Sequence, residues 1–284
     1  MLDVWVCSSC HSVNRERATR CYKCDSPRSA ATGEGEGLRP KRALLARITT
    51  PYRSTLELAL VAGLLIFILV GLEIWWTLLE ARQMPVIAGL LDGLAAGGDF
   101  NEGAWDAALS GNSQLDLATF GAYILAQLAF GLWLSVCVSN IPALGGGEAP
   151  VAPARTFIYS IIPVYNLRKV PQIVQDVLYR VDPRGGGIFL VAGAWIGIVG
   201  SWIVGRLVGL YIDTRLEVEA FNAESLAQFA AGARGLLDLS FALDVVITGL
   251  ICVGAVALFA IMAQVERRAA ARNREIEAEL STVA

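Results

Sequence analysis

Charged residues are scarce in this chain of 284 residues: they make up 17% of it, whereas hydrophobic residues make up 55%. Soluble domains carry about 25% charged residues, so the composition excludes an ordinary soluble enzyme and favours a membrane protein. Cysteine is also sparse, at six residues, which excludes a disulfide-rich secreted mini-protein. The single histidine is His11, so the chain after it lacks histidine chemistry altogether.

Catalytic motifs are missing as well. The sequence contains no phosphate-binding loop, no H-E-x-x-H zinc motif and no G-x-S-x-G nucleophile motif. It therefore predicts a protein that is not an enzyme.

Long apolar runs are abundant, by contrast. A spanning helix needs roughly 20 mostly apolar residues to cross ~30 Å of hydrocarbon. Four segments meet this requirement, at about 56–79, 117–138, 186–205 and 245–264. They predict an all-α domain of four transmembrane helices over residues 55–264 in contact with the lipid bilayer, followed by a helical tail at 265–284.

The basic residues are distributed unevenly, and this predicts the orientation. Residues 1–55 hold ten of the 23 basic residues, whereas the first connecting segment, 80–116, holds only Arg82. The segment 139–184 and the C-terminal tail are also rich in Arg and Lys. By the positive-inside rule, we expect a multi-pass protein of the inner (plasma) membrane with both termini in the cytoplasm.

The segment between the second and third spans is unusual. Residues 156–171 are apolar but too few to span, which suits an interfacial or re-entrant segment. Pro171 is a good first helical residue. After it, apolar residues recur at helical spacing, at Ile173, Val174, Val177, Leu178 and Val181. We therefore expect an amphipathic helix lying along the inner interface.

Three ionisable residues lie at about the same depth at the outer ends of the spans. These are Glu73, Arg206 and Asp244. They predict either an intramembrane polar cluster, with Arg206 bridging the two acids, or three side chains that each snorkel to the outer interface.

Four cysteines fall within the first 24 residues, as Cys7, Cys10, Cys21 and Cys24. Two C-x2-C pairs separated by ten residues can close a tetrahedral zinc site. Disulfides are disfavoured on the reducing cytoplasmic side, and a segment this short needs the folding energy of a metal. The spacing predicts one structural Zn²⁺, with a redox or vestigial cluster as the alternative.

The same segment resembles the Ran-binding-protein-2 type zinc finger over residues 3–28. Six positions fit that family's pattern: Trp5, Cys7, Cys10, Asn14, Cys21 and Cys24. The resemblance implies two stacked β-hairpins around one zinc, with Trp5 packed against the site and Asn14 fixing the loop. It gives a finger at 1–28, joined by a flexible basic linker, 29–54, to the spans.

Members of that family bind single-stranded RNA or ubiquitin. The resemblance to the RNA binders covers Val13, Asn14 and Arg17, but Arg15 stands where they carry a stacking aromatic residue. His11 and Ser12 stand where the ubiquitin binders carry Thr-Phe. We therefore expect the surface of Val13, Asn14, Arg15 and Arg17 to contact a protein or the membrane rather than RNA.

A second resemblance lies in the membrane half. The string Ile162-Pro163-Val164-Tyr165-Asn166-Leu167, followed by Pro171, resembles an uncharacterised bacterial family of multi-pass membrane proteins known only as a domain of unknown function. It would cover about residues 55–265 and implies a bacterial membrane protein of no known activity.

These features favour a non-enzymatic adaptor or regulator. Its cytoplasmic finger would bind a protein, or RNA, partner beside a four-helix membrane unit. The protein could also form a homo-oligomer. The alternative is a small transporter or channel with the finger as a regulatory module.

The zinc site gives the first testable prediction. Purified protein should carry about one equivalent of zinc, and Cys21→Ser should lose it because a tetrahedral site needs all four ligands. Metal analysis of the purified protein measures this. Less than about half an equivalent in the wild type would contradict it.

Overall fold

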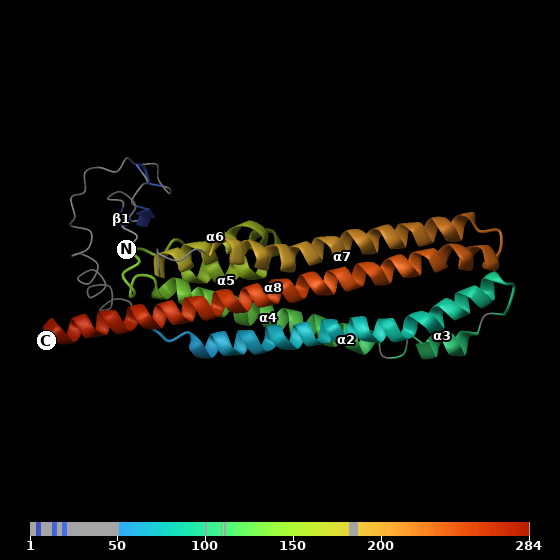
Figure 1. The fold of residues 1–284 in the computed structure, drawn as a ribbon, viewed down its shortest axis with the longest axis horizontal. Helices are drawn as coiled ribbons and strands as arrows, with labels where there is room; N and C mark the ends of the chain where they lie inside the picture. Colours follow the sequence, from blue (N-terminus) through green and yellow to red (C-terminus); the bar gives the residue numbers. More distant parts are fainter. Residues whose placement is uncertain are drawn as a thin grey trace. The chain divides into compact units, whose positions relative to one another are not determined.

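A computed structural model describes residues 4–6, 13–15, 19–21, 51–99, 101–108, 110, 112–181 and 187–283. All regular secondary structure described from residue 51 onward is helical, as the composition predicts (Figure 1). The helices are α2 (Leu56–Ala95), α3 (Glu102–Ala108), α4 (Asn112–Asn140), α5 (Pro153–Ile161), α6 (Pro163–Val181), α7 (Ile188–Asn222) and α8 (Leu226–Val283).

Near the N-terminus two short strands pair antiparallel, β1 (Val4–Val6) and β2 (Val13–Arg15). Their register places Trp5 opposite Asn14. The second hairpin implied by the finger resemblance lies outside the described residues, so the zinc finger stays a prediction.

Four helical stretches are long and apolar enough to cross a membrane. They are Leu56–Ala95, Glu102–Asn140, Ile188–Asn222 and Leu226–Ala278. Three of them contain a predicted span, and Ile188–Asn222 contains the predicted third span from residue 188 onward. The prediction of a multi-pass membrane protein is confirmed in this form.

The helices continue well beyond the predicted spans. The 40 residues of α2 extend for about 60 Å, twice the hydrocarbon thickness. Two segments expected as connections, 80–116 and 206–244, are largely helical, because α2 runs to Ala95, α7 runs to Asn222 and α8 begins at Leu226. A helical extension of this kind needs its own apolar core.

The chain divides into two compact units, and the division passes through α2, α4, α7 and α8. Unit 1 contains residues 1–64, 125–193 and 257–284, and unit 2 contains residues 65–124 and 194–256. In unit 2, an apolar core joins the helical extensions. Its buried members are Ile87, Leu91, Leu94, Ala230 and Ala233, and Trp105 and Phe229 pack against them.

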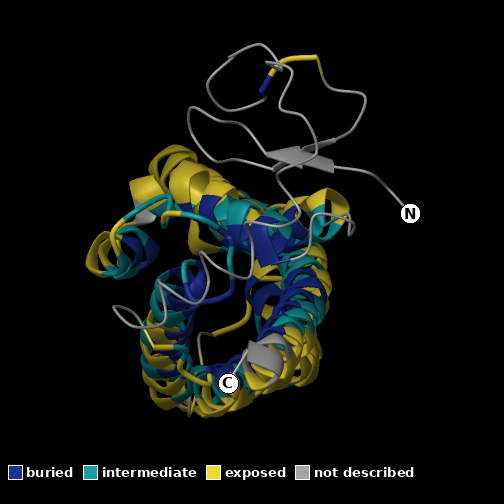
Figure 2. Cartoon of the chain, turned by 90° about the vertical axis from the view of Figure 1, so that its left-hand side faces the viewer, coloured by how far each residue is buried: buried dark blue, intermediate teal, exposed yellow. Residues whose placement is uncertain are grey.

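Unit 1 holds the largest fully buried side chains, among them Trp133, Leu134, Ile141 and Ile261. Buried positions lie on the inward faces of the helices and exposed ones on the outward faces (Figure 2). This arrangement suits helices in a bilayer, because the exposed outward faces would contact the hydrocarbon of the lipids.

The amphipathic helix of the middle segment exists, but its surroundings differ from the prediction. The five predicted apolar positions are buried within unit 1, with Val174 at 1% exposure. The helix begins at Pro163 and contains Pro171 in its interior. Its apolar stripe therefore contacts protein instead of lying on the lipid, because helical periodicity alone does not distinguish these two apolar neighbours.

In unit 2, α7 and α8 approach each other backbone to backbone at Gly197 and Gly254. A Cβ at Gly197 would lie 2.6 Å from the carbonyl oxygen of Leu250, and one at Gly254 would lie 2.8 Å from the backbone nitrogen of Ile198. Small residues at such crossings allow close packing of membrane helices, and here neither position has room for a methyl group.

This crossing gives the second prediction. Gly197→Ala should destabilise the protein by about 1–3 kcal/mol, because the added methyl must push two backbones apart. Gly209→Ala on the same helix is the matched control, since a Cβ there meets nothing within 4 Å. Thermal unfolding in detergent measures both, and equal midpoints for the two variants would contradict the crossing.

Candidate functional site

The predicted finger residues are only partly described. Val13, Asn14 and Arg15 form β2, and Cys21 is buried at 2% exposure. The other predicted ligands, Cys7, Cys10 and Cys24, lie outside the described residues, as does Arg17. The zinc site and its partner surface remain predictions.

In unit 1, the chain that enters α2 is held by polar contacts to α4 and α8. Asn140 bonds the backbone of Arg53 twice: its Oδ1 accepts from the backbone N–H at 3.0 Å, and its Nδ2 donates to the carbonyl at 2.7 Å. Glu266 Oε1 accepts from Thr55 Oγ1 at 2.6 Å and from Trp133 Nε1 at 2.8 Å.

We call Arg53, Thr55, Trp133, Asn140 and Glu266 the Glu266 clamp. Three of its members are almost fully buried: Thr55 at 1%, Trp133 at 0% and Asn140 at 3% exposure. Hydrogen bonds to a carboxylate are stronger than those between neutral groups. Because these groups are buried away from water, losing a bond would leave them unsatisfied. The clamp therefore fixes the chain at residues 53–55, immediately before α2.

Two arginines hold the glycine-rich loop that follows α4. Gly145 and Gly147 adopt positive φ angles of 74° and 81°, which favour glycine. Arg180 Nη1 donates to the carbonyls of Gly146 at 3.1 Å and Glu148 at 2.7 Å. Arg180 is 6% exposed, so its side chain is buried beneath this loop.

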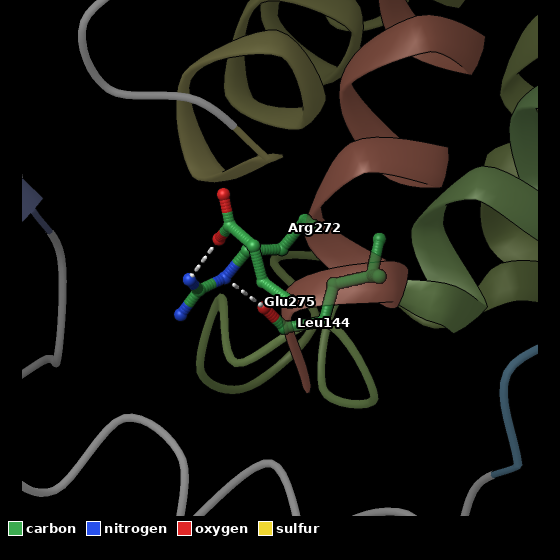
Figure 3. Close-up of polar contacts among 3 residues, drawn as sticks. All are labelled: Leu144, Arg272 and Glu275. Atoms are coloured by element: carbon green, nitrogen blue, oxygen red, sulfur yellow. Dashed lines mark hydrogen bonds and ion pairs between the residues drawn. The ribbon is translucent and has the colours of Figure 1, made fainter. Parts of the chain in front are cut away.

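Arg272 on α8 reaches the same loop (Figure 3). Its Nε donates to the carbonyl of Leu144 at 3.5 Å, and its Nη1 lies 2.7 Å from Glu275 Oε2. The C-terminal part of α8 is thereby tied to the loop.

The string that carries the membrane-family resemblance forms a bend. The backbone at Ile162 is extended (φ −81°, ψ 117°) and separates α5 from α6. The carbonyl of Ser160, in the last turn of α5, accepts from Gln127 Nε2 and from Asn166 Nδ2, the latter at 3.2 Å. These two amides supply partners that a helix end otherwise lacks.

In unit 2, the predicted polar cluster is only partly assembled. Glu73 lies within electrostatic range of Asp244 and Asp116. Arg206, however, is exposed, and among the described residues no ion pair joins it to either predicted acid. In its place, the carboxyl of Glu80 lies next to Asp244.

Sequence reasoning missed Glu80, although a signal was present. It follows Glu73 by two helical turns and therefore shares its face of α2. It places a second carboxyl beside Asp244.

These carboxyls open onto a cavity of about 260 Å³ in unit 2. Its lining consists of Trp76, Leu79, Glu80, Gln83, Met84, Ile87, Asn112, Leu237, Ser240 and Asp244. Gln83 Nε2 donates to Asn112 Oδ1 at 2.9 Å on one wall. An apolar and aromatic lining with two acids suits an amine or other organic cation.

Residues 98–268 match a protein family described as "Domain of unknown function (DUF4328)". The match covers well over half of the chain. The chain belongs to this family. No curated protein and no solved structure matches it.

The DUF4328 region is shorter than the resemblance predicted, since it begins at residue 98 rather than near 55. It includes the bend at Ile162 and ends on α8 just after Glu266. In this DUF4328 protein, the cavity draws Asp244 and Asn112 from the family region and Glu80 from α2. The Glu266 clamp is divided in the same way, with Arg53 and Thr55 outside the region.

Proposed function

We propose that this DUF4328 protein is a non-enzymatic adaptor or regulator of the inner membrane, whose N-terminal zinc finger holds a cytoplasmic protein partner there. The Glu266 clamp carries the proposal. It anchors the chain immediately before α2 through buried bonds to two other helices, as a tether that bears a bound partner requires.

The residues of the N-terminal segment fit a zinc ion. Cys7, Cys10, Cys21 and Cys24 form an all-thiolate donor set with the spacing of a tetrahedral site. Cys21 is buried, and the pairing of β1 with β2 supports a finger of the Ran-binding-protein-2 type. When bound, zinc would supply the folding energy that this short segment lacks.

The partner surface of the finger is basic. Val13, Asn14 and Arg15 lie together on β2, and Arg17 follows two residues later. Arginine side chains favour an acidic protein surface through charge-assisted hydrogen bonds. Confinement at the membrane raises the effective concentration of whatever the finger binds.

Recovery of partners tests this proposal. Full-length protein purified from native membranes should enrich a set of cytoplasmic proteins, and Cys21→Ser should lose that set because the finger no longer folds. Cys252→Ser on α8 is the matched control and should retain it. Identical sets from wild type and Cys21→Ser would refute recruitment by the finger, and salt-sensitive recovery of RNA weakened by Arg17→Ala would replace the protein partner with RNA.

The cavity in unit 2 favours a second candidate function, transport of an organic cation. Glu80 and Asp244 provide the negative charge and Trp76 an aromatic wall. The broken helix at Ile162 gives additional support, since discontinuous helices are common in transporters. The finger would then be a regulatory module.

Uptake by reconstituted vesicles tests this candidate. A fluorescent lipophilic cation should enter vesicles that contain the wild type, and Asp244→Asn should slow its entry by about tenfold through the loss of a charged contact. Arg206→Ala is the control, because Arg206 is exposed and does not line the cavity. Uptake no faster than into empty vesicles would eliminate the candidate.

A further inference from the structure

Helix α5 has its polarity reversed relative to a helix of a soluble protein. Its polar residues Thr156 and Ser160 are fully buried, both at 0% exposure, whereas Ile158 is 49% and Ile161 is 39% exposed. The reversal continues into α6, where Val164 is 74% exposed. In water, helices bury the apolar face, so the outer face of this segment requires an apolar environment.

The depth of α5 follows from its contacts with α4 inside unit 1. Ser135 Oγ donates to the carbonyl of Pro153 at 2.8 Å, and Gln127 Nε2 donates to the carbonyl of Ser160. As α5 proceeds, its contacts move back along α4 by eight residues, or about 12 Å of helix. The two helices touch at Gly131, where a Cβ would lie 3.0 Å from Ser160 Cβ.

Gln127 lies near the middle of the apolar segment of α4, residues 117–138. The carbonyl to which it donates belongs to the last turn of α5, directly before the bend at Ile162. The bend therefore lies about half way through the apolar thickness that α4 crosses.

The return path of the chain shows where the apolar environment ends. Tyr165 and Leu167 on α6 are still 43% exposed. Arg168 and Lys169 follow, both exposed, and from Val170 onward the apolar residues turn inward and are buried. This change from exposed apolar to exposed basic residues is the pattern of a chain leaving hydrocarbon for the headgroups.

We propose that α5 and the first part of α6 form a re-entrant hairpin. It enters the bilayer beside the C-terminal half of α4, turns at Ile162 near the bilayer midplane and leaves on the same side, with phospholipid acyl chains covering its outer face. Arg155, Arg168 and Lys169 at the two ends complement anionic headgroups. This inference is independent of the finger and of the cavity.

The bend has the backbone satisfaction that such a position demands. Non-helical backbone at membrane depth persists only where its polar groups find partners inside the protein. Gln127 and Asn166 give the carbonyl of Ser160 two donors. The backbone N–H of Ile162 donates to Ile158 at 3.1 Å, and its carbonyl accepts from the N–H of Asn166 at 2.9 Å.

Fluorescence quenching in the full-length protein tests the hairpin. A fluorescent amino acid replaces Ile161 by codon suppression, and in a matched control it replaces Gln175, which is exposed on α6 beyond the proposed exit. Both proteins are reconstituted into phosphatidylcholine–phosphatidylglycerol vesicles. The quenchers are aqueous iodide and lipids with a nitroxide either near the headgroup or near the end of the acyl chain.

At position 161 the deep nitroxide should quench at least about twofold more strongly than iodide, and at position 175 the order should reverse. Stronger quenching at 161 by the shallow nitroxide than by the deep one would place the segment along the interface and overturn the re-entrant hairpin. Strong iodide quenching at 161 would place it in water. No quenching by either agent would show that protein covers this face, which also overturns the proposal.

Discussion

The hydrogen bond from Gln127 to the carbonyl of Ser160 is the contact on which the bent middle segment depends. A helix satisfies its own backbone, and an interrupted helix does not. In water the exposed carbonyl would bind solvent, whereas in hydrocarbon it would cost several kcal/mol. Gln127 on α4 and Asn166 on α6 remove that cost from both sides. The string of residues that resembles the membrane family thus has a physical role, because the extended backbone at Ile162 separates α5 from α6 and Asn166 donates to the carbonyl of Ser160 at the end of α5.

Much of the membrane architecture could be predicted from the sequence, because a run of about 20 apolar residues has few stable solutions. The ends of the helices could not. Residues such as Ile87 and Leu91 continue α2 because they meet Ala230 and Ala233 of α8, and that meeting is a tertiary property. The periodicity of the middle segment likewise identified the buried face of α6, but lipid and protein core demand the same pattern.

The candidate sites likewise include residues that local sequence predicts and residues that only tertiary contacts bring together. The similar depth of Glu73 and Asp244 in their spans predicted that the two acids lie close together. Depth does not determine the direction of a side chain around the helix axis, and Arg206 is exposed. Glu80 shares a helix face with Glu73 and was accessible from spacing alone. Arg180 was not, since its burial under the glycine loop comes from two carbonyls that the sequence does not mark. The predicted metal ligands are a different case: the spacing of four cysteines alone predicts their chemistry, and three of the four lie outside the described residues.

The Glu266 clamp contacts mostly the backbone, and few side chains, of the segment that it holds. Asn140 reads the N–H and the carbonyl of residue 53, groups that every residue except proline carries. Only the hydroxyl of Thr55 is supplied by a side chain from outside the DUF4328 region. The family region therefore contributes the side chains that bind, and the preceding segment contributes mainly backbone groups. Apart from the hydroxyl of Thr55, these contacts therefore place little constraint on the side chains that precede α2.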